Sequence, residues 1–135
     1  MGAPTQTRYP DALAAPWLAV RLGIDPARID VMRRDGELIA VRDPGSIEWR
    51  YPAWQFHEGR VRPGIARIVA AAREGGLDDP KLYELLMSPR GLHEVGRRRL
   101  VDLLLEGRVD DVVSALRAGA RRRRSRPPAR SRHRR

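Results

Sequence analysis

The chain has 135 residues, the length of one ordinary domain or of two small subdomains that share a core. It contains no cysteine, which excludes a disulfide framework and a thiolate metal site. No apolar run approaches the roughly 20 residues that a membrane-spanning helix needs, so we expect a soluble, cytoplasmic protein without a membrane partner. The net charge of +10 is concentrated in residues 121–135, which hold nine arginines and no acidic residue.

Two short helices are predicted near the start of the chain. Apolar residues recur at helical spacing over residues 11–22, and Gly23 is expected to stop this helix. A second helix is predicted over residues 26–34, with Asp25 as its cap and Pro26 at its first position. Two helices joined by a tight glycine turn fit the helix-turn-helix plan, in which the second helix enters the major groove of DNA.

The second helix and the segment after it carry the arginines that we expect to contact DNA. Ile29 and Met32 would anchor the helix inside, leaving its arginines to reach base edges and phosphates. Residues 38–41 and 47–51 are β-prone runs around a turn at 43–46, which predicts a hairpin or wing. The expected DNA contacts are Arg28, Arg33, Arg34, Arg42 and Arg50. The alternative is a helical hairpin whose arginines form a solvated face, because nearby aspartates make the second helix almost neutral.

Four further helices are predicted in the second half of the chain. The first covers residues 63–74 and has one apolar face, and the third buries Leu100, Leu103 and Leu104. The second is expected to be capped by Asp79 and to end at Ser88-Pro89, and residues 90–96 after it are expected to be irregular. Gly107 is expected to stop the third helix, and Asp110 or Asp111 to cap a short last one.

Residues 36–41 and 51–56 are followed by the Ser88-Pro89 break and by the pattern Leu-x-Asp-Leu-Leu-x-x-Gly at residues 100–107. In this order, residues 10–118 resemble proteins that join a MerR- or excisionase-like helix-turn-helix to a C-terminal domain of the Xre/MbcA/ParS antitoxin type. The chain departs from that pattern where the family commonly has a tryptophan before the break and a proline opening the next helix. The resemblance implies an antitoxin-like repressor of its own operon, which binds a cognate toxin, often a RES-domain enzyme that consumes NAD.

A surface for such a protein partner is expected beside the leucine stripe of the third of these helices. Because a stripe of three leucines is narrow, we expect it to face the core of its own domain and to leave neighbouring residues exposed. The expected partner-binding residues are Leu92, Arg97, Arg98, Val101 and Leu105.

An enzyme is not expected. The three histidines lack the spacing of metal ligands, and the chain has neither a nucleophile elbow nor a glycine loop that could cradle a phosphate. The paired aspartates precede apolar helical runs, where capping explains them. The aromatic residues Trp49, Tyr51, Trp54 and Phe56 could stack on bases, but we expect them to join two subdomains in the core. We therefore expect no catalytic residue, no metal and no cofactor.

The predicted fold is mainly α. Residues 1–9 are expected to form a disordered lead-in, 10–56 a winged helix-turn-helix with a short β-hairpin, 57–118 a small helical partner-binding domain, and 119–135 a disordered arginine-rich tail. The tail is interpreted as a nucleic-acid arm that acts by counterion release, with a solubilising end as the alternative. Its expected contacts are Arg121, Arg122, Arg123, Arg124 and Arg126.

The sequence thus predicts a DNA-binding antitoxin that regulates transcription of a toxin-antitoxin operon, and it leaves two alternatives open. One is a general nucleic-acid-binding protein that acts through its tail, and the other is a structural interaction module. A helix-turn-helix that reads a palindrome needs a dimer, so a homodimer is also expected.

Overall fold

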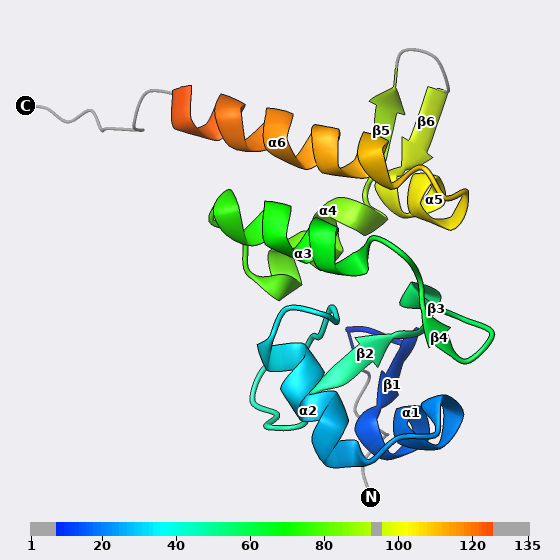
Figure 1. The fold of residues 1–135 in the computed structure, drawn as a ribbon. Helices are drawn as coiled ribbons and strands as arrows, with labels where there is room; N and C mark the ends of the chain where they lie inside the picture. The colour runs from blue at the N-terminus through cyan, green and yellow to red at the C-terminus, as the bar shows by residue number, and fades with distance from the viewer. Residues whose placement is uncertain (1–7, 93–95, 126–135) are drawn as a thin grey trace, which may run out of the picture.

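The computed structural model describes residues 8–92 and 96–125, and it is mainly helical with small antiparallel strand pairs (Figure 1). The helices are α1 (Ala15–Leu22), α2 (Pro26–Arg34), α3 (Ile65–Glu74), α4 (Asp79–Met87), α5 (Leu100–Leu105) and α6 (Val109–Ser125), with a 3-10 turn η1 (Ala53–Gln55). The strands are β1 (Ala12–Ala14), β2 (Arg50–Pro52), β3 (Phe56–His57), β4 (Arg60–Val61), β5 (Pro89–Leu92) and β6 (Gly96–Arg99). Strand β1 pairs with β2, β3 with β4, and β5 with β6. Within the described ranges, no helix is long and apolar enough to cross a membrane.

The predicted pair of short helices is present as α1 and α2. Gly23 adopts a left-handed conformation (φ +69°), and its N–H donates to the carbonyl oxygens of the last turn of α1. The side chain of Asp25 accepts a hydrogen bond of 2.8 Å from the N–H of Ala27, which caps α2 as predicted. Helix α1 begins later than expected because residues 12–14 pair with β2.

Residues 38–41 form a buried central segment rather than a strand of a wing. All four side chains have 0% exposure, because the segment runs between two hydrophobic clusters. Leu38 and Ala40 point into an N-terminal cluster with α1, α2 and Tyr51, whereas Ile39 points into a C-terminal cluster formed mainly by α3–α6. The predicted pairing with residues 47–51 is reduced to one bridge, between Val41 and Arg50. Successive side chains of an extended segment point in opposite directions, so this segment separates the two clusters and contributes side chains to both.

The side chain of Gln55 supplies the hydrogen bonds that a neighbouring strand would give this segment. It is fully buried; its Oε1 accepts from the N–H of Ile39 and its Nε2 donates to the carbonyl oxygen of Ile39, both at 2.8 Å. Trp54, next to it, packs against the C-terminal cluster, while Tyr51 and Phe56 pack in the N-terminal one. Tyr51, Trp54 and Phe56 thus pack at the two clusters as predicted, whereas Trp49 is only partly buried and lines a surface cleft.

Two residues of the predicted N-terminal lead-in, Arg8 and Tyr9, make contacts within the fold. The N–H of Arg8 donates to Asp43, and Tyr9 is buried in edge-to-face contact with Tyr83, with ring centroids 4.8 Å apart. Tyr83 in turn donates a hydrogen bond of 2.8 Å to Asp11. Residues 8 and 9 are therefore part of the fold, and residues 1–7 lie outside the described ranges.

The helical half differs from its prediction at three places. In the stretch expected to be irregular, residues 90–92 and 96 belong to the paired strands β5 and β6, and residues 93–95 lie outside the described ranges. Helix α4 is capped by Asp78, whose side chain accepts from the N–H of Lys81, and not by Asp79. Helix α6 runs to Ser125, so residues 119–125 are helical and the predicted boundary of the tail is wrong. Residues 126–135 lie outside the described ranges.

Candidate nucleic-acid interface

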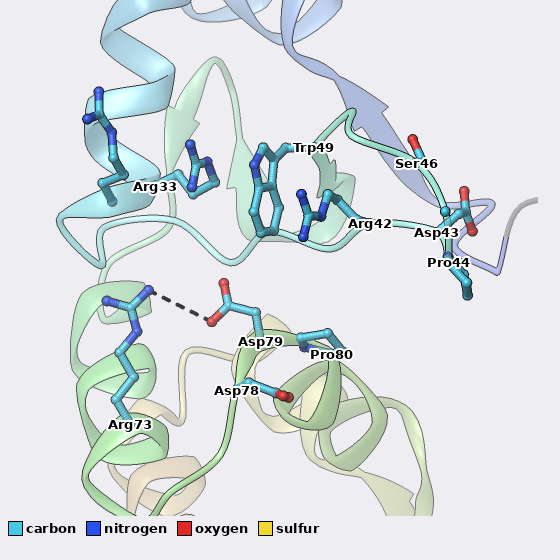
Figure 2. Close-up of a pocket in the computed structure, with 12 residues that line it drawn as sticks. Arg33, Arg42, Asp43, Pro44, Ser46, Trp49, Arg73, Asp78, Asp79 and Pro80 are labelled. Atoms are coloured by element: carbon cyan, nitrogen blue, oxygen red, sulfur yellow. Dashed lines mark ion pairs between the residues drawn. The ribbon is translucent and has the colours of Figure 1, made fainter.

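A cleft of about 520 Å³ separates the end of α2 and the loop of residues 42–49 from the end of α3 and the start of α4 (Figure 2). Arginines come to it from three elements: Arg33 and Arg34 from α2, Arg42 from the loop, and Arg73 from α3. The cleft therefore lies where the expected DNA-contacting elements meet the helical half of the protein.

Trp49 organises the loop side of this cleft. The guanidinium carbon of Arg33 lies 4.5 Å from the centre of the indole ring and that of Arg42 lies 4.4 Å from it. Figure 2 shows the ring standing between the two side chains. Each cation–π contact contributes about 0.5–1 kcal/mol at an exposed site and more where water is excluded. The stack therefore ties the loop to the last turn of α2 and holds Arg42 at the edge of the cleft.

Arg33 is placed differently from the prediction. Its side chain is only 16% exposed and forms an ion pair and hydrogen bond with Asp30. That hydrogen bond is the main reason that the pKa of Asp30 is lowered. Arg33 also lies beside the hydroxyl of Tyr51, whose pKa is raised, chiefly by burial. The arginine is thus used inside the fold, where it positions the loop, and it is not free to reach a base.

The other four predicted DNA contacts are more accessible. Arg28 is exposed on the first turn of α2, and Arg34 is 63% exposed at the last, 2.8 Å from Asp30. Arg42 is exposed, and Arg50 is partly exposed, 3.7 Å from Glu48. The structure brings Arg34 and Arg42 to one cleft, while Arg28 lies at the opposite end of the helix.

Asp79 lies across the cleft, on the first turn of α4. Its Oδ2 accepts a hydrogen bond of 3.1 Å from the N–H of Ala40, and its Oδ1 lies 3.9 Å from Arg73 (dashed in Figure 2). Burial raises the pKa of this carboxyl group, and the Ala40 and Arg73 contacts partly oppose the shift. The side chain therefore joins the central segment to the helical half.

The predicted partner-binding residues do not form one exposed surface. Val101 is 1% exposed and belongs to the C-terminal cluster, so its prediction is wrong. Leu105 is 41% exposed on α5, and Arg98 pairs with Glu106. Leu92 and Arg97 lie in the paired strands β5 and β6. Helix α5 packs against β6 and α6. As a result, more of its side chains are buried than the predicted stripe of three leucines.

The predicted tail contacts fall on the end of α6. Arg121, Arg122, Arg123 and Arg124 are all exposed, and Arg123 also donates a hydrogen bond of 3.2 Å to the carbonyl oxygen of Gly75. Arg126 lies outside the described ranges. Among the described residues, no three histidine, aspartate or glutamate side chains lie together so that they could hold a metal ion.

Three organising residues of this region were missed by the sequence analysis: Trp49 as a stacking platform, Gln55 and Asp79. Trp49 had been assigned only to the core. A glutamine inside an aromatic run was a signal that a buried segment nearby needs side-chain hydrogen bonds. The partner of Asp79 lies 39 residues away along the chain, so no local pattern could have found it.

No family model matches this chain, and no curated protein matches it. Among solved structures, the chain is similar to the NMR structure of Rv2175c. The two share 24% identical residues and superpose with a TM-score of 0.72, over 88% of this chain and 86% of the other. The comparison shows a shared fold.

Proposed function

We propose that the protein is a sequence-directed DNA-binding regulator, in which α1 and α2 act as a helix-turn-helix and the loop of residues 42–49 takes the place of the predicted wing. The observation that carries the proposal is the Arg33–Trp49–Arg42 stack, which fixes the loop against α2. A loop held in this way presents Arg42 at a constant position relative to the exposed arginines of α2, as contacts to one duplex require.

The residues divide into two roles. Arg28, on the exposed first turn of α2, is the candidate for a bidentate contact to guanine in the major groove, because the N-terminal residues of a recognition helix contact the base edges. Arg34, Arg42 and Arg50 are candidates for phosphate contacts, which fix the register of the protein on DNA without reading the sequence. Arg33 positions the loop and does not touch DNA.

Selection from a random-sequence pool of duplex DNA tests the proposal. The full-length protein should enrich one sequence, and two inverted copies about 10 base pairs apart would indicate a dimer on a palindrome. Binding that retains all sequences equally would contradict a reading role for α2 and favour general nucleic-acid binding.

The proposal includes a protein partner of the antitoxin type, bound on the surface around Leu105 and Arg98. Support comes from Leu105, an exposed leucine on a helix whose other apolar residues are buried. The product of the adjoining gene should be captured by the wild-type protein and lost by Leu105→Glu. Val20→Glu, at a more exposed apolar position on α1, is the matched control and should retain capture. Equal capture by both variants would remove this surface, and no capture by the wild type would remove the antitoxin function.

A further inference from the structure

Helix α6 separates its side chains into an apolar face and a basic stripe. Its buried residues include Val112, Val113, Leu116 and Ala120, which pack in the helical half. Ser114, Arg117, Arg121 and Arg124 follow one another at spacings of three or four residues and are exposed. This spacing places the four on one face of the helix. We refer to Arg117, Arg121 and Arg124 as the α6 basic stripe.

The end of α6 is held in place on α3. A Cβ atom at Gly75 would lie 2.9 Å from the Cβ of Ala120, so the two helices approach as closely as a glycine permits. Arg123 donates to the carbonyl oxygen of the same glycine. Figure 1 shows the C-terminal ends of α3 and α6 on one side of the molecule. The basic stripe is therefore a fixed surface of the fold, unlike a flexible tail.

A further arginine, Arg73 of α3, lies close to the end of α2. The guanidinium of Arg73, near the end of α3, lies over Gly36, where an added Cβ would be 3.0 Å from its Nη1. Arg73 also lines the cleft together with Arg34. Arginines thus lie at the end of α2, near the end of α3 and along α6, where the three arginines of the stripe help to line a shallow groove of about 200 Å³ between α3 and α6.

The acidic residues along this path offset part of its charge. Asp30 is paired with Arg33 and Arg34, and Asp79 lies 3.9 Å from Arg73, while Asp78 caps α4. Glu74 is the acidic residue that lines the groove beside the stripe. The groove therefore has three exposed arginines and one glutamate along its lining, and this net positive charge favours binding of a polyanion with regularly spaced charges.

We propose that the α6 basic stripe and Arg73 form a second phosphate-binding surface, which contacts the backbone of the duplex that α2 reads. The inference rests on the proposed DNA-binding function and extends it: contacts reach beyond the site read by α2, toward one flank of the DNA. Backbone contacts of this kind add affinity that is independent of sequence and sensitive to salt.

The absence of cysteine from the chain provides a direct test. Single cysteines replace Ser114 beside the stripe, Ile47 on the loop, and His57 on β3, and each carries a reagent that cleaves DNA nearby. The probe is a 40-base-pair duplex with the sequence selected by the wild-type protein at its centre. Ser114→Cys should cleave the flank on one side, Ile47→Cys should cleave near the centre, and His57→Cys should not cleave.

The outcomes separate the two proposals. Cleavage from position 47 without cleavage from 114 would overturn the second surface and retain the helix-turn-helix. Cleavage from 114 without cleavage from 47 would overturn the role of the loop and retain the second surface. If neither position cleaves a bound duplex, both proposals fail.

Salt dependence gives an independent measurement. The double variant Arg117→Gln/Arg121→Gln should reduce the slope of log affinity against log salt by about 1–2, since each lost phosphate contact contributes roughly 0.9. The matched control Arg60→Gln/Arg108→Gln removes the same charge from exposed positions outside the stripe and should leave the slope unchanged. Equal slopes for the two doubles would contradict the surface. A loss of affinity for single-stranded RNA alone would assign the stripe to RNA instead of DNA.

Discussion

The carboxylate of Asp79 accepts a hydrogen bond of 3.1 Å from the backbone N–H of Ala40, and this bond joins the start of α4 to the buried central segment. The two residues belong to different halves of the protein and lie 39 positions apart along the chain. Asp79 therefore supplies a hydrogen-bond acceptor to the central segment, which separates the two hydrophobic clusters.

Replacing Asp79 tests this role. Asp79→Ala leaves the N–H of Ala40 buried without its partner, which should lower the free energy of unfolding by about 1–3 kcal/mol. Asp79→Asn keeps an acceptor oxygen without a buried charge and should be much less destabilising. Urea unfolding of the two variants measures the difference, and equal losses would show that the acceptor has no role.

The same carboxyl group predicts a dependence on pH. Burial raises its pKa above the ordinary value of 3.8, so the folded state binds the proton more tightly than the unfolded state does. The resulting stability is present below the unfolded pKa and is lost as pH rises through the folded pKa. Asparagine does not titrate. The stability of Asp79→Asn relative to wild type should therefore rise as the pH is raised from about 4 through the folded-state pKa, and a constant difference would contradict the raised pKa.

Gln55 should be intolerant of substitution, because both ends of its amide bond to Ile39 in a fully buried site. Gln55→Leu leaves an N–H and a carbonyl oxygen unpaired, at about 1–3 kcal/mol for each group. Gln55→Glu retains the acceptor but loses the donor when ionised, and it should recover stability in acid. Thermal unfolding at two pH values checks this, and a Glu variant that is less stable in acid would contradict the assigned geometry.

The adjacent leucines of α5 provide a matched pair. Leu104 is 2% exposed in the C-terminal cluster, whereas Leu105 is 41% exposed. Leu104→Ala should cost about 2–5 kcal/mol of stability, and Leu105→Ala should change it by less than about 0.5 kcal/mol. Denaturant unfolding compares them, and similar losses would mean that Leu105 is covered and unavailable to a partner.

The sequence predicted the elements whose signals are local. Helix α2 followed from the capping aspartate and Pro26, and α3 followed from one apolar face. The central segment was misassigned because a short run of four apolar residues looks the same in a wing and in a strand buried on both faces. Only contacts with Gln55 and Asp79, distant along the chain, distinguish the two.

The remaining errors have similar causes. The end of α6 was expected to be disordered because arginine-rich segments lack apolar residues, yet arginine favours helices and a basic last turn complements the helix dipole. Arg33 was expected to face DNA because its helix position is near the surface. Its guanidinium instead stacks on the ring of Trp49, sixteen residues later, and no periodicity in the sequence predicts that contact.

The most direct test of DNA reading by α2 is the affinity of Arg28→Ala for the selected duplex and for a scrambled duplex of the same length. Arg60→Ala is the control, since it removes an equal charge from an exposed site on β4. Arg28→Ala should weaken binding to the selected duplex by about 1–3 kcal/mol, with little change on the scrambled duplex and with unaltered thermal stability. Equal weakening on both duplexes, or no weakening on either, would contradict the role of α2 as the reader of sequence.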